Sequence, residues 1–452
     1  MKYQDAIAWI IERSGYDRGF VANPFLGDEV AALGLRRTAS LLRRVGSPER
    51  AMRVLHVAGT KGKGSTSATI ATVARAGPAA GSRTGLYATP HLHTFRERFL
   101  IDDEPISEGE FAAVADLLLP ADRAVQAEEP ELGEPTAFEI ATALALLAFG
   151  RAGVDLAVME VGMGGRLDAT NVVSPAVSVI TTISYDHTAI LGDTLTQIAF
   201  EKAGIIKPSI PVVVGPQLLE ALAELERIAA ERASPLYRAD RDWQTEWTSS
   251  GATLSGPWGD WRGVSLALAG RHQVENAGLA LMALHLLDPR LLGNEARVRS
   301  ALSSVRWPGR FERISVSPDI YVDGAHNVDS IARLVETLRD IRDEAPLVIL
   351  GVSRDKDIAG MLQAFAPLQP EIIATASHNP RAADPALIAD AALAAGFVAS
   401  IAASVTVALD VAREQAAGRV VVVTGSLYAV AEAREAVGLA ETPVFERTLL
   451  YG

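Results

Sequence analysis

The chain has 452 residues, of which 49% are hydrophobic and 21% charged, with a formal net charge of −13 and no cysteine. This length exceeds what one core usually organises and predicts two domains. The composition is typical of a globular protein, and the missing cysteines exclude disulfides, thiolate nucleophiles and Cys–zinc sites. The acidic balance argues against a nucleic-acid partner, because such proteins usually carry a basic face. The net charge does not exclude anionic small substrates, since a local cluster of cations outweighs a diffuse negative surface.

The N-terminal stretch from Met1 to Arg13 carries charges on both sides of a short apolar patch. It lacks the apolar core and the small-residue cleavage site of a signal peptide. The apolar run from Ile140 to Gly150 ends at Arg151, short of the roughly 18 residues that span a membrane. We therefore expect a cytoplasmic protein with no membrane partner.

Strand-like and helix-like segments alternate over the first two-thirds of the chain, which predicts a mostly parallel sheet with helices on both faces. The expected strands are Val54–Val57, Leu156–Val161, Val177–Thr181 and Pro211–Val214. The expected helices include Ser65–Arg75, Phe138–Phe149 and Leu218–Arg232.

The stretch from Ala239 to Leu268 differs, because four tryptophans lie among Gly, Ser and Thr in short alternating pieces. This pattern predicts a small antiparallel appendage. A helix from Asn276 to Leu287 should follow, ending before Asp288-Pro289.

Alternation restarts after Trp307-Pro308-Gly309, with expected strands at Ile320–Val322, Leu347–Leu350, Ile372–Thr375 and Val420–Val423. The sequence thus predicts an α/β protein with a P-loop-type domain over residues 1–297. A smaller α/β domain is expected over residues 298–452. In such sheets ligands bind beyond the carboxyl ends of the strands, so we expect a nucleotide site in a cleft between the two domains.

The strongest motif is a glycine-rich loop that follows the first expected strand. It reads Gly59-Thr60-Lys61-Gly62-Lys63-Gly64-Ser65. Backbone N–H groups of such a loop turn toward a polyphosphate, lysines match its charge, and a serine hydroxyl can bind Mg²⁺. Gly64 separates Lys63 from Ser65, so this is not the common P-loop string. ATP is the first hypothesis, and a ligand-free glycine-rich turn is the alternative.

Two further groups follow expected strands. Glu160 ends one, where a carboxylate beside a phosphate loop is a natural Mg²⁺ ligand; a solvated strand end is the alternative. Asp186-His187 follows another and should converge on the same loop, although a lone histidine is often structural. Glu201-Lys202 reads as a surface charge pair on a helix that Pro208 stops.

Taken together and in order, the motifs resemble those of the Mur ligase superfamily, and within it of folylpolyglutamate synthase and the bifunctional dihydrofolate synthase/folylpolyglutamate synthase. They span almost the whole chain: HVAGTKGKGS (56–65), TPHL (89–92), EVGMGGRLDATN (160–171), DHTAILG (186–192), EKAGIIKP (201–208), GRHQVENA (270–277), WPGRFE (307–312), DGAHN (323–327) and SHNPRA (377–382).

The resemblance implies a role for each matching residue. The implied Mg²⁺ ligands are Ser65, Glu160, His187 and Lys202, with two ions expected and Lys202 matching a lysine that is carbamylated in many relatives. Asn276 and Arg310 match contacts to the ATP phosphates, and Asp323 and His326 match the second domain's contribution to the nucleotide. The implied catalytic groups are Lys63, His187, Lys202 and Arg310. The implied pterin-substrate site comprises Thr89, Pro90, His91, Leu92, Thr136, Phe138, Arg166 and Asp168.

The resemblance also implies the fold and the reaction. The second domain should be Rossmann-like, and the protein should be a monomer. ATP should phosphorylate the carboxylate of dihydropteroate or a folate, and L-glutamate should displace the phosphate. Tyr87-Ala88, the segment 95–99 and the Trp-rich insert 243–261 depart from the family pattern. The alternatives are an inactive nucleotide-binding relative and a peptidoglycan-precursor ligase, although the latter usually needs a further N-terminal domain before the phosphate loop.

Overall fold

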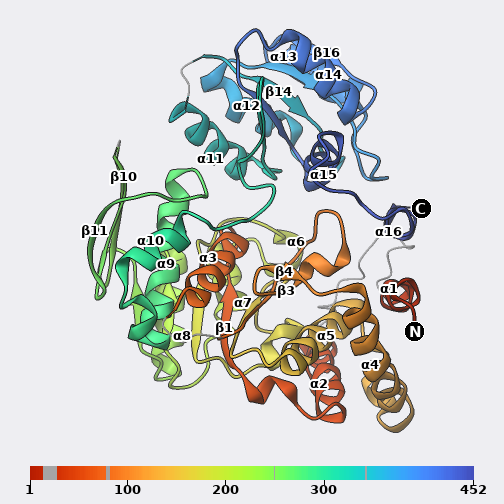
Figure 1. Cartoon of the computed structure of the whole chain (residues 1–452), viewed down its shortest axis with the longest axis vertical. Helices are drawn as coiled ribbons and strands as arrows, with labels where there is room; N and C mark the ends of the chain where they lie inside the picture. The colour runs from red at the N-terminus through yellow and green to blue at the C-terminus, as the bar shows by residue number, and fades with distance from the viewer. Residues whose placement is uncertain (14–27, 78–81, 249, 342–343, 452) are drawn as a thin grey trace. The chain divides into compact units, whose positions relative to one another are not determined.

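The computed structural model describes residues 1–13, 28–77, 82–248, 250–341 and 344–451. These form two compact units (Figure 1). The first comprises Met1–His91, Phe95–Ala267 and Gln273–Val305, and the second comprises Leu92–Thr94, Leu268–His272 and Arg306–Gly452. The domain boundary between residues 297 and 298 stays a prediction.

The first unit is built on an eight-stranded sheet in the order β4-β3-β2-β5-β1-β6-β7-β8. In this order the neighbouring strands from β2 to β8 are parallel to one another. β3 is antiparallel to β2, and β4 is antiparallel to β3. All four strands expected in this region are present. The bounds are β1 Arg53–Ala58, β2 Thr84–Tyr87, β3 Phe99–Ile101, β4 Glu104–Pro105, β5 Leu156–Glu160, β6 Val177–Ile180, β7 Val212–Val214 and β8 Leu236–Arg238.

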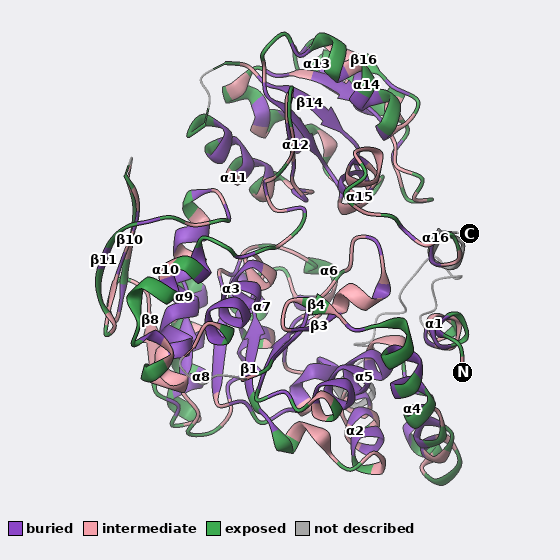
Figure 2. Ribbon diagram, viewed as in Figure 1, coloured by how far each residue is buried: buried purple, intermediate pink, exposed green. Residues whose placement is uncertain are grey.

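Helices flank this sheet. α3 (Lys63–Arg75) packs on β1, β2 and β5, and α7 (Leu195–Ala203) packs against α8 (Leu219–Glu231). A second group consists of α1 (Tyr3–Glu12), α2 (Asp28–Arg44), α4 (Glu108–Glu128) and α5 (Ala137–Ala152). The central strands are buried, as Figure 2 shows, because both faces of a parallel sheet are covered.

A buried ion pair holds α5 to α2. The Nε and Nη2 atoms of Arg37 donate to the two carboxylate oxygens of Glu139 at 2.7 and 2.8 Å, and Nη1 donates to the Leu132 carbonyl at 2.6 Å. Glu139 also completes a capping box with Thr136, the N-cap of α5. Arg37 therefore fixes the start of the helix that carries Phe138.

Replacing Arg37 with alanine should destabilise the protein by about 3–5 kcal/mol, because it leaves the buried Glu139 carboxylate without its cation. The double variant Arg37→Ala/Glu139→Ala should recover part of this loss. Urea unfolding of the three proteins measures both effects. Equal stability of Arg37→Ala and the unchanged protein would contradict the prediction.

The expected antiparallel appendage is confirmed as a three-stranded sheet in the order β11-β10-β9. Its strands are β9 Gln244–Thr248, β10 Gly251–Gly256 and β11 Gly259–Val264. α9 (Arg271–Leu287) follows and begins five residues before the predicted start at Asn276. The indole of buried Trp243 lies against Gly278 of this helix. After α9 come η6 (Pro289–Leu292) and α10 (Glu295–Leu302).

The second unit has a six-stranded sheet in the order β12-β13-β17-β14-β15-β16, parallel except for β12. The strands are β12 Glu312–Val316, β13 Asp319–Val322, β14 Leu347–Leu350, β15 Glu371–Ala374, β16 Ala399–Ile401 and β17 Val421–Thr424. Side chains alternate between two cores, with Val348 and Leu350 in one and Leu347 and Ile349 in the other. The first core packs on α11 (Val328–Arg339), α12 (Ile358–Phe365) and α13 (Pro385–Ala394), and the second on α14 (Val405–Gln415) and α15 (Leu427–Ala436).

Candidate nucleotide and carboxylate site

The phosphate-loop motif lies between β1 and α3, as predicted. Gly59 and Gly62 have positive φ values of +144° and +88°, and an ideal Cβ on either would collide with a neighbour. At Gly59 the obstacle is Thr181 Oγ1 at 1.8 Å, and at Gly62 it is Asn276 Oδ1 at 2.4 Å. These positions require glycine, both for the backbone conformation and for the space.

Neighbouring strands bring other predicted groups to this loop. β1 lies between β5 and β6 in the sheet, and Val57 is in register with Glu160. Glu160 is buried, with 3% of its surface exposed. The carboxyl ends of these strands therefore place the phosphate loop beside Glu160 on one side and the segment 181–187 on the other.

Hydrogen bonds fix the segment after β6 to the loop. The backbone N–H groups of Thr60 and Lys61 donate to the Thr182 carbonyl at 3.0 and 3.1 Å. The hydroxyl of Thr60 lies 3.1 Å from the Ser184 carbonyl. Lys61 Nζ lies 3.1 Å from Asp186 Oδ2, so the Asp186-His187 dipeptide is drawn to the same edge. His187 itself is half exposed and is the N-cap of α6 (Thr188–Leu191).

Lys202 is buried, so the expectation of a surface charge pair is wrong for this residue. Its Nζ donates to the Gly59 carbonyl at 2.9 Å, and Lys63 Nζ donates to the same carbonyl at 3.1 Å. Burial, together with the neighbouring Lys63 and Lys61 and against the opposing effect of Asp186, lowers the pKa of Lys202 to about 7. Three lysine side chains thus surround one glycine-rich turn.

The titration of Lys202 should be visible in protein stability. The pKa of Lys202 is about 7 in the folded chain and 10.5 for the ordinary group. Unfolded chains therefore bind more protons across that interval, and stability should rise as the pH increases through it, by at most about 1.4 kcal/mol per pH unit. Below the folded-state pKa the penalty is constant.

Lys202→Met should remove this slope, because methionine has a similar shape and no charge. Urea unfolding at several pH values in CO₂-depleted buffer measures the slope for both proteins. If the stability of both proteins changed with pH in the same way, the lowered pKa of Lys202 would be contradicted.

The helix that carries Lys202 ends earlier than predicted. α7 stops at Ala203 rather than at Pro208. The loop after β5 takes the Glu201 carbonyl that a longer helix would pair with the Ile205 N–H, and it packs so closely on Gly204 that an ideal Cβ there would lie 2.2 Å from Arg166 Cα. The Arg166 N–H donates to the Glu201 carbonyl at 2.8 Å, so the two motifs pack directly on each other.

Gln273 lies within the GRHQVENA motif (270–277), but no role was predicted for it. Its Nε2 lies 3.4 Å from Ser65 Oγ, and its Oε1 accepts a hydrogen bond of 2.9 Å from Asn276 Nδ2. The signal was its spacing, because residues three apart on a helix share a face. Asn276 lies against Gly62, so α9 contacts the phosphate loop at two points.

Among the predicted substrate residues of the first unit, Phe138, Arg166 and Asp168 come together at the loop after β5. The Phe138 ring lies against Gly162, and Asp168 Oδ2 approaches the same glycine. Arg166 forms a hydrogen-bonded ion pair with Glu201 at 2.7 Å. Thr136 caps α5, and His91 Nδ1 accepts a hydrogen bond from Arg98 Nε at 3.0 Å. Thr89 and Pro90 are joined by a cis peptide bond.

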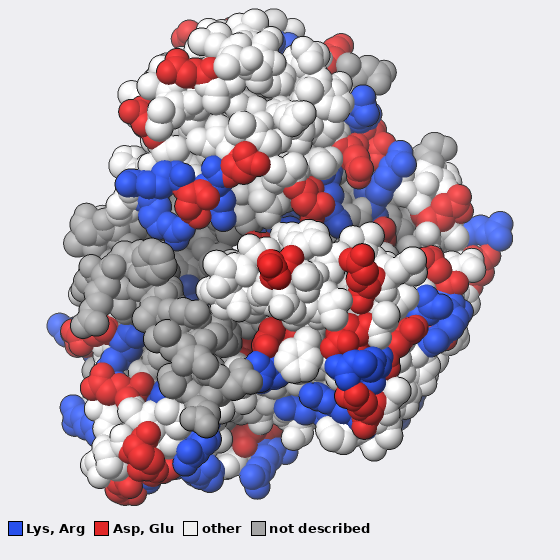
Figure 3. Space-filling model, turned by 180° about the vertical axis from the view of Figure 1, so that it is seen from behind, with Lys and Arg blue, Asp and Glu red and all other residues white. Residues whose placement is uncertain are grey.

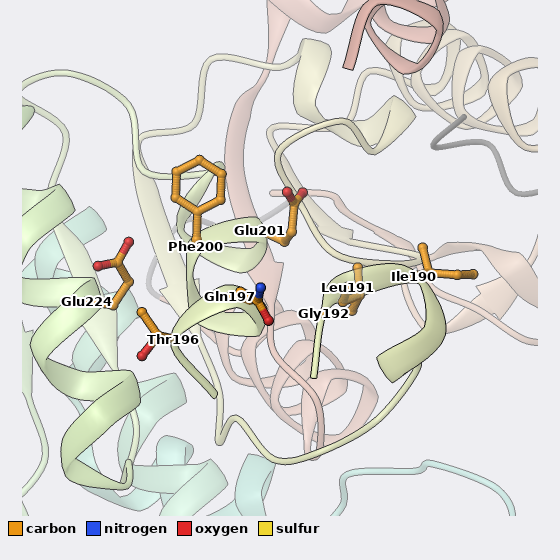
Figure 4. A pocket seen from close by; sticks show the side chains of 8 residues that line it. All are labelled: Ile190, Leu191, Gly192, Thr196, Gln197, Phe200, Glu201 and Glu224. Atoms are coloured by element: carbon orange, nitrogen blue, oxygen red, sulfur yellow. The ribbon is translucent and has the colours of Figure 1, made fainter. Parts of the chain in front are cut away.

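A cavity of about 440 Å³ lies beside α7 (Figure 4). Its lining comes from α6, the following loop, α7 and α8, and includes Phe200, Glu201 and Glu224. Lys202 points instead to Gly59. The cavity and the phosphate loop therefore contact different faces of the same helix.

In the second unit, Arg310, Asp323 and His326 come together around the turn after β13. Arg310 lies against Gly324, and Asp323 accepts hydrogen bonds from the N–H groups of Phe311 and Ala325 at 2.8 and 2.9 Å. Burial raises the pKa of Asp323, and Arg310 opposes that shift. His326 Nδ1 lies 2.8 Å from the Gly324 carbonyl, which places the ring proton on Nδ1.

Charged side chains of both signs are interspersed on the face in Figure 3. Among the described helices, none combines the length and the apolar character of a membrane span. Groups of three or more His, Asp or Glu with metal-binding geometry are also absent from the described part of the chain.

Residues 57–284 match the Mur ligase middle domain, and residues 309–427 match the Mur ligase glutamate ligase domain. The chain belongs to the Mur ligase family. Within it, the chain is similar to the dihydrofolate synthase/folylpolyglutamate synthase of Bacillus subtilis, with 34% identity over 96% of this chain and 98% of the relative. The corresponding Mycobacterium tuberculosis protein is 36% identical over 80% of this chain and 77% of its own length.

Solved structures agree with these relatives. A Mycobacterium tuberculosis folylpolyglutamate synthase complexed with ADP and AMPPCP has a TM-score of 0.83 and 33% identity, over 92% of this chain and all of that one. An Escherichia coli FolC structure in complex with DHPP and ADP has a TM-score of 0.79 and 30% identity, over 96% and 97% of the two chains. The α/β fold with two sheets and an antiparallel appendage is thereby confirmed.

Proposed function

We propose that this protein is an ATP-dependent ligase that joins L-glutamate to the carboxylate of a pterin-linked substrate, either dihydropteroate or a folate. The observation that carries the proposal is the presence of Lys61 and Lys63 on one glycine-rich turn, next to the buried Glu160 and Lys202. Such a concentration of positive charge is suited to a triphosphate. Family membership and the nucleotide complexes of its relatives support the same assignment.

A carboxylate is a poor acyl donor because its leaving group would be oxide. Transfer of the γ-phosphoryl group of ATP to a carboxylate oxygen gives an acyl phosphate and ADP. The neutral amine of glutamate then attacks the acyl carbon, the C–O bond to phosphate breaks, and the amine loses a proton. The first step depends on positioning and charge neutralisation, which we assign to Lys63, Asn276 and Arg310.

The residues present fit Mg²⁺ in their chemistry. Glu160 and Ser65 supply hard oxygen ligands at the phosphate loop, and Mg²⁺ commonly combines one or two protein ligands with substrate phosphates. Ser65, Glu160 and His187 would hold the ion, which would neutralise phosphate charge during transfer. Lys202 has the burial and the lowered pKa that favour carbamylation, since only the neutral amine reacts with CO₂. The resulting carboxylate-like group could ligate a second ion.

We infer that Arg310, Asp323 and His326 bind the nucleotide together with the phosphate loop. We also assign the protein to the cytoplasm, as a monomer.

The test is the dependence of ADP release on substrates. With Mg²⁺-ATP, the purified protein should release ADP only when both a pterin carboxylate and glutamate are present. Equal release without either would contradict ligase activity. Parallel assays with dihydropteroate and with tetrahydrofolate, each with labelled glutamate, then separate dihydrofolate synthesis from polyglutamate extension.

A further inference from the structure

His56 is a buried histidine in β1, three residues before Gly59. It lies in register with Met159 of β5 and Ser178 of β6, and it has no exposed surface. Its Nε2 lies 2.8 Å from Thr170 Oγ1. Burial lowers its pKa to about 3, with Lys207 adding to the shift, so the ring is neutral near neutral pH.

The hydrogen bonds around Thr170 have one consistent direction. The Thr170 hydroxyl donates to Asp168 Oδ1 at 2.5 Å. A hydroxyl has a single proton, so it must accept from His56, whose Nε2 therefore carries the ring proton. The chain of donors runs from His56 through Thr170 to the Asp168 carboxylate.

Asp168 is also hydrogen-bonded to the backbone of the loop after β5. Its Oδ1 accepts from the Thr170 N–H and its Oδ2 accepts from the Met163 N–H, both at 3.0 Å. These bonds close the loop from Gly162 to Asp168 on itself. Asp168 is 5% exposed, so the bonds lie largely out of water, where they are strong and directional.

Asn171 extends the network to the other side of the loop. Its Nδ2 donates to the Arg166 carbonyl at 2.9 Å and lies 3.3 Å from the Gly204 carbonyl at the end of α7. The segment from Asp168 to Asn171 thus connects the strand of the phosphate loop, the loop that carries Arg166, and the helix that carries Lys202.

We propose that His56 and Thr170 are positioning residues, which hold Asp168 and its loop in the geometry that binds the carboxylate substrate. This rests on the proposed function, in which Asp168 and Arg166 contact that substrate. The hydroxyl of Thr170 is the essential group, because it alone joins the imidazole to the carboxylate. The loop has little regular structure of its own and needs such external bonds for preorganisation.

Steady-state kinetics separate this role from general stability. Thr170→Val removes the hydroxyl at nearly constant volume and should raise KM for the pterin carboxylate about tenfold, with KM for ATP changed less than about twofold. Thr170→Ser keeps the hydroxyl and should have the same KM as the unchanged protein. Thr337→Val is the matched control, since it removes a buried threonine bond to the Arg333 carbonyl elsewhere and should leave both constants unchanged. Equal impairment by Val and Ser, or none in Thr170→Val, would overturn the proposal.

Histidine NMR tests the network without using activity. The chain has 8 histidines, and the signal lost in His56→Gln assigns His56. That signal should show the Nε2-protonated tautomer, should not titrate between about pH 5 and pH 8, and should shift in Thr170→Val but not in Thr337→Val. An Nδ1-protonated or titrating His56 would overturn the proposal even if ligation is confirmed. The expected spectra with an inactive unchanged protein would instead leave the network intact and reject the ligase function.

Discussion

Replacing Glu160 with alanine should lower the rate of ligation by about a thousandfold, because loss of a cation's carboxylate ligand removes several kcal/mol of charge stabilisation from phosphoryl transfer. The fold should survive, since the backbone pairing of β5 with β1 and β2 does not involve this side chain. Initial rates of ADP release at saturating substrates measure the loss. Thermal unfolding measures the fold.

Two further variants make this result specific. Glu160→Gln keeps the shape and should be almost as inactive as alanine, because an amide brings no negative charge to a cation. Glu224→Ala is the control: Glu224 lines the cavity beside α7 and pairs with Arg227. It should retain full activity, and unchanged turnover in Glu160→Ala would remove Glu160 from the mechanism.

Gly62→Ala should abolish ATP-dependent turnover, by at least about a hundredfold, because displacement of reacting groups by about 1 Å has effects of that size. The new methyl group would meet Asn276 Oδ1 at 2.4 Å, so either the loop or α9 must move. A positive φ adds a backbone cost of about 1–2 kcal/mol. Turnover and ATP affinity by calorimetry report the first effect, and urea unfolding the second.

Gly46→Ala is a closely matched control for this variant. Gly46 has φ +89° against +88° at Gly62, but nothing lies within 4 Å of its ideal Cβ. Both variants should show the backbone cost, and only Gly62→Ala should lose activity. Loss of activity in both, or in neither, would contradict the role given to the contact with Asn276.

The sequence predicted the architecture well where apolar residues recurred periodically or where Gly and Pro marked the ends of the elements. The buried strands Val54–Val57 and Leu347–Leu350 are short, mainly apolar runs that are each followed by a loop containing glycine, and both are present. Strands β2, β3, β4, β8, β12 and β16 were not predicted. Of these, β3, β4, β8 and β16 have two or three residues each, too few for periodicity to be detected.

The candidate site was predicted mainly from motifs and less well from local chemistry. Lys202 was read as a surface group because Glu201 precedes it, yet Glu201 pairs with Arg166 and Lys202 turns inward to Gly59. Only tertiary packing distinguishes these two directions on one helix. For the same reason the end of α7 at Ala203 could not be predicted, since the Glu201 carbonyl there accepts a hydrogen bond from Arg166, a residue distant in the sequence.

The antiparallel appendage was the segment for which no role could be given. Trp243, at its base, packs on Gly278, and Asn276 on the same helix lies against the phosphate loop. Gly278 and Asn276 are only about half a helical turn apart. The Trp243 indole and the phosphate loop therefore contact neighbouring positions of one rigid helix. We therefore expect a change in how Trp243 packs on this helix to shift the Asn276 amide that faces Gly62.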